Sequence, residues 1–138
     1  MHKKILIVED EIFVALELED IVRGAGFAVR EIAADRASAM KVAEECDIAL
    51  VDLNLRDGAT GPQIGETLAR DYGVRVIYVT ANPAQIGAAA ATALGVIPKP
   101  FSAATVRAAL AMAASNTPPP PAAWQIAGFI PLGLSAGS

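Results

Sequence analysis

Short apolar runs alternate with longer stretches of helical periodicity along most of this chain of 138 residues. Five apolar runs predict buried strands, at residues 4–8, 27–33, 48–51, 74–79 and 96–98. The intervening stretches and the one after the last run predict helices at residues 11–24, 37–45, 62–71, 83–94 and 103–114, the last of them capped by Ser102. Strands that alternate with helices form a parallel sheet with helices on both faces. The pattern therefore predicts a doubly wound α/β domain.

The composition of the chain changes near residue 116. We expect one domain over residues 1–116, followed at 117–138 by a proline-rich linker and an apolar tail. The net charge of −4 gives no electrostatic reason to bind nucleic acid or an anionic membrane surface. The apolar runs are too short to span a bilayer. Cys46 is the only cysteine, which excludes an internal disulfide and indicates a cytoplasmic protein.

Polar side chains follow four of the five predicted strands. Glu9 and Asp10 come after the first strand, Asp52 after the third, Thr80 at the end of the fourth and Lys99 after the fifth. The carboxyl ends of parallel strands meet at one edge, so we expect these side chains to lie together. Converging carboxylates repel each other unless a cation joins them, and oxygen ligands of this kind suit Mg²⁺. A carboxylate can attack a phosphoryl group, and nearby positive charge assists the transfer. The constellation predicts a phosphoryl-accepting site.

Four short motifs resemble those of the receiver domain of two-component response regulators. They are VED at residues 8–10, VDLN at 51–54, VTAN at 79–82 and PKPF at 98–101. Each motif is weak by itself, but their order and their placement at strand ends are specific. The resemblance runs from Lys3 to about Ala114. It implies a five-stranded sheet of flavodoxin-like order 2-1-3-4-5 and a signalling module that is not an enzyme.

The resemblance also implies a role for each residue of the predicted site. Asp52 is expected to be the phosphoacceptor, and Thr80 and Lys99 are expected to contact the phosphoryl group. The expected Mg²⁺ ligands are Asp10, Asp52, the backbone carbonyl of Asn54 and, through water, Glu9. Asn54 and Asn82 occupy positions where family members tune hydrolysis of the acyl phosphate, and a cis peptide is expected between Lys99 and Pro100. The implied partner is a histidine kinase or a phosphotransfer protein.

Two positions depart from the family pattern. Arg56 stands four residues after the acceptor, where most receivers have proline, and the following Asp57-Gly58 predicts a different turn. Val96 stands three residues before the lysine, where the family usually has Tyr or Phe. Valine has no ring to swing inward, so we expect activation to pass through Thr80 and the neighbouring loops instead.

Two other functions compete with this interpretation. A dehalogenase-type phosphatase needs a general acid two residues after the nucleophile, where this chain has Asn54, and acidic metal ligands after the lysine, whereas residues 100–138 contain no Asp or Glu. A receiver-like interaction module that works without phosphate would lack the acceptor, an acid or the lysine, and all are present. Arg107 is the only basic residue after Lys99, so a helix-turn-helix is not expected there. We expect a single-domain receiver that signals by protein contact or acts as a phosphate relay or sink.

The tail after residue 116 is unusually apolar. The four prolines at 118–121 predict a stiff segment of about 12 Å. The apolar side chains that follow are Trp124, Ile126, Phe129, Ile130, Leu132 and Leu134. Exposed together they would form a patch that soluble monomers avoid. We expect the tail to dock on the face of the fifth strand and last helix, in its own chain or in a homodimer. The predicted contacts there are Val96, Ala104, Ala108 and Ala111.

Overall fold

A six-stranded sheet forms the centre of the computed structural model, which describes residues 3–115 and 126–132. The strands are β1 Lys4–Val8, β2 Ala28–Ala33, β3 Ile48–Val51, β4 Arg75–Thr80, β5 Gly95–Pro98 and β6 Ile130–Pro131. Their order is β2-β1-β3-β4-β5-β6. The first five strands are parallel, which confirms the predicted fold class, and the antiparallel β6 is an addition from the tail.

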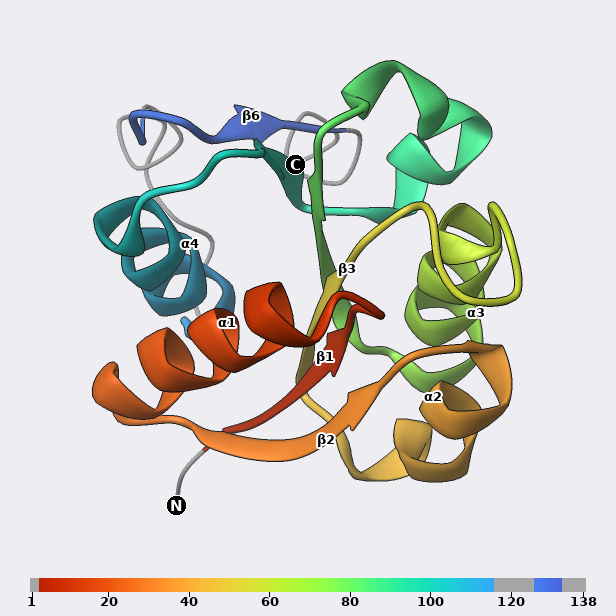
Figure 1. Ribbon diagram of the computed structural model, residues 1–138, viewed down its shortest axis with the longest axis horizontal. Coiled ribbons are helices and arrows are strands. Elements are labelled where there is room, and N and C mark those ends of the chain that lie inside the picture. The colour runs from red at the N-terminus through yellow and green to blue at the C-terminus, as the bar shows by residue number, and fades with distance from the viewer. Residues whose placement is uncertain (1–2, 116–125, 133–138) are drawn as a thin grey trace.

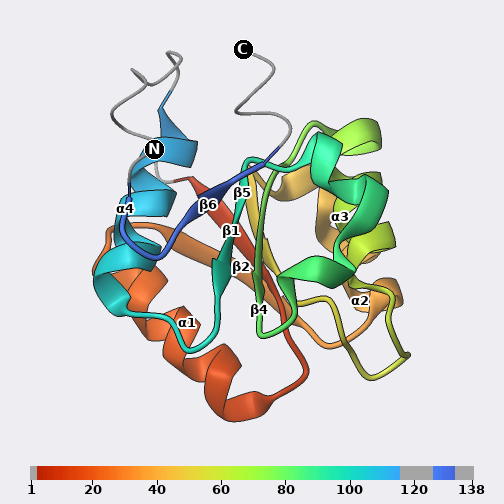
Figure 2. The same ribbon diagram turned by 90° about the horizontal axis from the view of Figure 1, so that it is seen from above.

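Helices cover both faces of the sheet (Figures 1 and 2). One face carries α1 Ile12–Gly24 and α4 Ala103–Ala114, and the other carries α2 Arg36–Val42 and α3 Gly61–Tyr72. None of the helices in the described ranges is long and apolar enough to cross a membrane.

The side chains of β1 show how the core is divided between the two faces. Ile5 and Ile7 belong to the cluster beneath α1 and α4, whereas Leu6 and Val8 belong to the cluster beneath α2 and α3. All four are fully buried. A strand covered on both faces needs apolar side chains in both directions, which explains the unbroken apolar run.

The predicted helix at residues 83–94 is wrong. The structure has two 3₁₀ helices there, Pro83–Gln85 and Gly87–Thr92. Gly87 has a φ of 64°, a left-handed conformation that an α-helix does not accommodate. Helices in proteins are stabilised mainly by packing of an apolar face, and in the segment 83–92 only Ile86 and Ala89 are buried. Alanine propensity alone did not make this segment α-helical.

The cap predicted for the last helix agrees with the structure. Ser102 caps α4 by accepting a hydrogen bond of 3.1 Å from the Thr105 N–H, as expected. The helix predicted at residues 37–45 is divided into α2 and a 3₁₀ turn at Ala43–Glu45. The cis peptide between Lys99 and Pro100 is confirmed.

The described part of the tail packs against its own domain. Ile130 and Pro131 lie opposite Val96 and Gly95 of β5, which confirms docking and confirms Val96 as a contact. The predicted contacts Ala104 and Ala111 are wrong, because both side chains remain exposed, and Ala108 is half-buried. The proline run, Trp124 and Leu134 lie outside the described residues.

Candidate functional site

The carboxyl ends of β1, β3, β4 and β5 surround one pocket of about 370 Å³. Its lining residues are Asp10, Glu11, Asp52, Asn54, Leu55, Thr80, Ala81, Asn82 and Lys99. The topology explains the convergence, since parallel strands present their carboxyl ends at the same edge of the sheet. The structure therefore brings the predicted site residues together, with Glu9 buried beside them.

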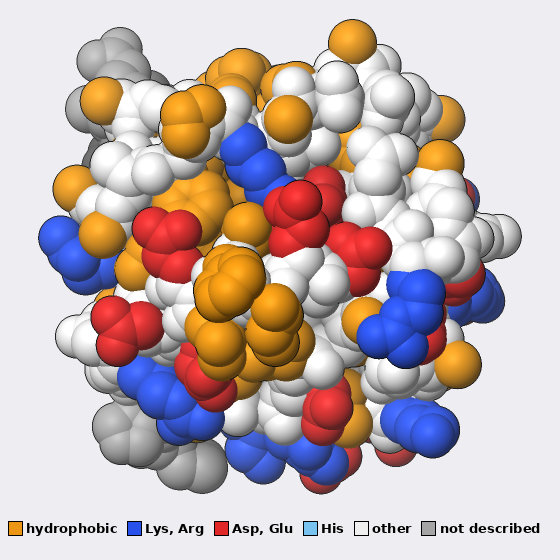
Figure 3. Space-filling view, in the orientation of Figure 1, with side chains coloured by type: hydrophobic (Ala, Val, Ile, Leu, Met, Phe, Trp, Pro, Cys, Tyr) orange, Lys and Arg blue, Asp and Glu red, His pale blue; other side chains and the backbone are white. Residues whose placement is uncertain are grey.

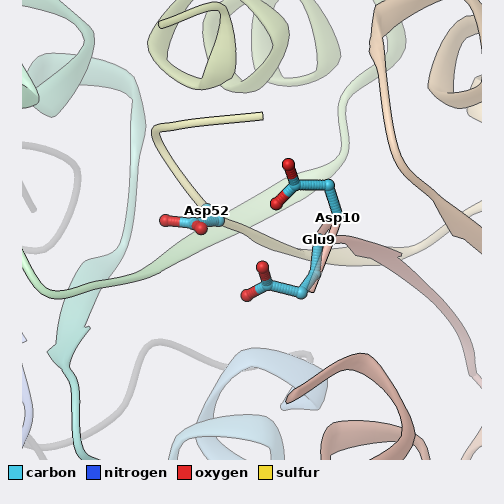
Figure 4. A group of neighbouring side chains, drawn as sticks. All are labelled: Glu9, Asp10 and Asp52. Carbon is cyan, nitrogen blue, oxygen red and sulfur yellow. The ribbon is translucent and has the colours of Figure 1, made fainter. Parts of the chain in front are cut away.

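Three carboxylates meet in this pocket, from the ends of β1 and β3 (Figure 4). Glu9, Asp10 and Asp52 each place an oxygen within 4.8 Å of the others. Glu9 and Asp52 are buried, at 2% and 8% exposure, whereas Asp10 is exposed. Backbone N–H groups fix the two buried carboxylates: that of Glu11 donates to Glu9 Oε2 at 3.2 Å, and that of Leu53 donates to Asp52 Oδ1 at 2.7 Å.

Lys99 supplies the opposing charge. Its Nζ lies 2.8 Å from Glu9 Oε1 and 3.3 Å from Asp52 Oδ2, and Glu11 Oε2 is 3.9 Å away. Burial raises the pKa of Glu9 and the charge of Asp52 adds to this, although the bond to Lys99 opposes it. Burial alone would lower the pKa of Lys99, but Glu9 and Asp52 outweigh it and hold that pKa above its usual value. Lys99 is therefore a cation fixed between two buried carboxylates.

Thr80 and Asn82 form the side of the pocket above β4. The Thr80 hydroxyl is fully buried and accepts a hydrogen bond of 3.0 Å from the Asn82 N–H. The Thr80 carbonyl accepts a bond of 2.8 Å from the Lys99 N–H, which ties β4 to the residue that carries the cation. Ala81 is small and leaves the approach to Asp52 open.

The loop after Asp52 turns at Asp57-Gly58, as the sequence predicted. Leu55 and Gly58 exchange backbone hydrogen bonds of 2.8 and 3.0 Å across this turn, and Gly58 has a φ of 103°. The Asp57 carboxylate accepts from the Thr60 hydroxyl and from the Arg36 N–H, and these bonds lower the pKa of Asp57. The loop is therefore fastened at its tip to α2 and to the start of α3.

Three features of the site were missed by sequence reasoning. Gln85 Oε1 accepts a bond of 3.1 Å from the side-chain amide of Asn54, a residue that lines the pocket. The sequence predicts a helix around Gln85, and none of its neighbours indicates this contact. Glu11, which the sequence predicts only as the start of a helix, lines the pocket and places its Oε2 3.9 Å from Lys99 Nζ. A Cβ on Gly61 would lie 2.1 Å from the Asp52 carbonyl oxygen, so α3 begins against the acceptor. The Gly-Pro pair at the helix start was an available signal for that approach.

Comparison with known proteins decides the family. The family model described as the response regulator receiver domain matches residues 5–111. This chain belongs to the response regulator receiver family. As a receiver it is a signalling module and not a catalytic enzyme. Receivers bind Mg²⁺ at an acidic pocket and work with a kinase partner, and the cluster of Glu9, Asp10 and Asp52 is consistent with a phosphoacceptor site.

The receiver is similar to several proteins named PhyR. It is 36% identical over 118 residues to the phyllosphere-induced regulator PhyR of Methylorubrum extorquens, a match that covers 82% of this chain and 44% of that protein. The chain thus spans less than half the length of this relative. The solution structure of the Erythrobacter litoralis PhyR receiver domain is 31% identical, with a TM-score of 0.75 and coverage of 86% of this chain and 96% of that one. A CheY-like receiver from Methanospirillum hungatei is 28% identical, with a TM-score of 0.65 and coverage of 75% and 86%.

Proposed function

We propose that this receiver takes a phosphoryl group onto Asp52, in the cytoplasm, from a histidine kinase or a phosphotransfer protein. The observation that carries the proposal is the cation of Lys99 held against Glu9 and Asp52 at the mouth of an open pocket. A carboxylate oxygen of Asp52 attacks the phosphorus, the phosphorus–nitrogen bond of the donor phosphohistidine breaks, and its electron pair returns to the imidazole nitrogen. The product on Asp52 is an acyl phosphate.

The donor set fits a hard divalent cation. Asp10, Asp52 and the backbone carbonyl of Asn54 would hold Mg²⁺ directly, and Glu9 would act through water. Carboxylate oxygens within 4.8 Å of one another, with one exposed side chain, suit an ion that keeps several waters. The bound ion supplies positive charge to the phosphoryl oxygens.

Lys99 and Thr80 complete the proposed site. The Lys99 ammonium now contacts Asp52 itself, so it lies within reach of a group attached there. The Thr80 oxygen already accepts from Asn82, which leaves its hydroxyl hydrogen available to a phosphoryl oxygen. We propose that activation moves Thr80 and the loops at Asp57 and Asn82, while the packing of Val96 changes little.

The donor protein is proposed to dock on α1. Three large apolar side chains of its first turns are exposed, Ile12, Leu16 and Phe13, the last at 84%. A hydrophobic group stands over α1 with acidic side chains beside it (Figure 3). An exposed apolar patch of this kind marks a protein contact, and α1 begins directly after the residues of the acidic pocket.

We propose that the phosphorylated receiver signals by contact with another protein, or that it acts as a relay or sink for phosphoryl groups. A relative that supports the first is the protein described as anti-anti-sigma factor PhyR from Bartonella quintana, 26% identical, of which this chain covers 48%. An anti-sigma factor is therefore one candidate target. Pairing of two copies through the face of β5 and α4 is also part of the proposal.

The test is modification by a small acyl-phosphate donor, followed by intact mass. Wild type and Asp71→Ala, a control at an exposed carboxylate outside the pocket, should gain one phosphoryl group only with Mg²⁺ present. Asp52→Ala should gain none, and Asp10→Asn should need more Mg²⁺ because it loses a direct ligand. Equal modification of Asp52→Ala and Asp71→Ala would refute the proposal.

A further inference from the structure

The free side of β5 is shaped to receive residues 126–132, named the arm below. A Cβ on Gly95 would lie 2.2 Å from Cζ of Phe129 and 2.7 Å from the carbonyl oxygen of Ile130. The three atoms nearest to that position all belong to the arm. Gly95 therefore forms a notch that only a residue without a side chain can provide.

The arm is fixed in the notch by its backbone and by one ring. The Leu132 N–H donates to the Leu94 carbonyl at 3.0 Å, and the Ala127 carbonyl accepts from the Thr105 hydroxyl at 2.7 Å. The ring of Phe129 is buried in the cluster beneath α1 and α4. Leu132 packs on the cluster of the opposite face, so the arm holds both layers at the sheet edge.

The arm also ends the sheet. The backbone bond from Leu132 to Leu94 makes these two residues a hydrogen-bonded pair of the antiparallel ladder. Because hydrogen-bonded and non-hydrogen-bonded pairs alternate, the next pair, Pro131 and Gly95, is a non-hydrogen-bonded one. The nitrogen of Pro131 then faces away from β5, where proline has no N–H to offer another strand. One arm fits on β5, and a further strand is discouraged.

The contacts of the arm do not require that it belong to the same chain. The arm is anchored at Thr105, near the start of α4, whereas the chain leaves α4 at Ser115. The 12 residues of α4 are about 18 Å long. The ten residues 116–125 can span at most about 36 Å, twice the length of α4. The length of the connection therefore does not by itself tie the arm to its own domain.

We propose that two copies exchange arms, each arm seated in the Gly95 notch of the other copy. Exchange reproduces the same contacts in both copies and closes the pair by two-fold symmetry. Pro131, on the outer side of each arm, offers no N–H to a third copy. Arm exchange uses neither Asp52 nor Lys99, so it is independent of the proposed phosphoryl chemistry.

The test uses two full-length variants that are each deficient in one half of the contact. Gly95→Val fills the notch but keeps an intact arm, and Phe129→Ala keeps an open notch but loses the anchoring ring. Wild type should have the mass of a dimer by light scattering after gel filtration, and each variant alone should have the mass of a monomer. An equimolar mixture should form a species of twice that mass, with one arm of Gly95→Val seated in the notch of Phe129→Ala.

Three results would overturn the proposal. A wild type or a mixture that stays monomeric shows that the arm docks within its own chain. A dimer of Phe129→Ala alone shows that copies pair through the bare β5 edge, and a dimer of Gly95→Val alone shows that they pair elsewhere. Circular dichroism melts establish that both variants fold, and Gly95→Ala replaces Gly95→Val if the larger side chain disturbs β5.

Discussion

The acidic pocket and the Gly95 notch lie at the two ends of β5, and different forces hold them together. At one end, Lys99 lies within 3.3 Å of Glu9 and Asp52, two carboxylates that are almost fully buried. At the other end, Gly95 admits the ring of Phe129 and the backbone of the arm. The pocket is polar and open to solvent, whereas the notch is apolar and filled.

This difference separates reactivity from stability. Burying charges lowers the free energy of unfolding unless each is paired, and such groups persist where they do chemistry. Burying an apolar ring raises the free energy of unfolding and does no chemistry. Changes in the pocket should therefore alter phosphoryl acceptance and the pH dependence of stability. Changes in the notch should alter stability and the pairing of copies, but not phosphoryl acceptance.

The largest effect is expected from Lys99→Met. It leaves Glu9 and Asp52 facing each other without a cation, and the free energy of unfolding should fall by about 3 kcal/mol, the low end for a broken buried pair because the pocket meets solvent. Lys41→Met, at an exposed helix position, should change it little. Urea unfolding measures both. Adding Glu9→Gln to Lys99→Met should restore part of the loss, and a stable Lys99→Met protein would show that charge repulsion does not govern the pocket.

Phe129→Ala should have the next largest effect. Loss of the buried ring should lower the free energy of unfolding by about 2 kcal/mol at low protein concentration. The matched control is Phe13→Ala, whose ring is 84% exposed and should contribute little to stability. Phosphoryl acceptance at Asp52 from a small acyl-phosphate donor, which does not dock on α1, should be unchanged in both variants. If Phe129→Ala abolished it, the two ends of β5 would not be separable.

The smallest effect is a change in how stability depends on pH. The pKa of Glu9 is raised above 4.5, so the folded protein binds this proton more readily than the unfolded chain does. The contribution of Glu9 to stability is therefore greatest below that value and declines as the pH rises through the folded pKa. The stability difference between Glu9→Gln and wild type should move in favour of the variant over this range. The difference for Phe129→Ala should stay constant, and equal behaviour of the two would contradict the comparison.

Much of the fold could be predicted because the core sheet is parallel. Strands buried on both faces need unbroken apolar runs, and these are visible without any structure. The helix prediction for residues 83–94 was wrong because the alanines there favour a helix, while Gly87 adopts a left-handed conformation that ends a helix. β6 was missed as a strand because two residues carry no periodicity, although docking of the tail was expected from its exposed apolar content.

The pocket could be predicted further than the notch for a chemical reason. Acids, a threonine and a lysine at strand ends are uncommon enough to be informative, and the topology dictates that they converge. The roles assigned to them individually remain predictions. The role of Gly95 could not be predicted, because glycine at the start of a strand is common for several reasons. Its role here depends on contact with Phe129, 34 positions later in the chain. The Asn54 to Gln85 bond likewise depends on the conformation of residues 83–92.

The most direct test of the central claim is to locate the phosphoryl group on the chain. After treatment with an acyl-phosphate donor and Mg²⁺, hydride reduction converts a phosphorylated aspartate into homoserine. Trypsin then releases residues 42–56, which contain both Asp47 and Asp52, so the same peptide carries its own control. Fragment masses should place homoserine at position 52 and leave Asp47 unchanged. Homoserine at position 10 or 47, or none in wild type under conditions that modify other receivers, would contradict the assignment of Asp52 as the acceptor.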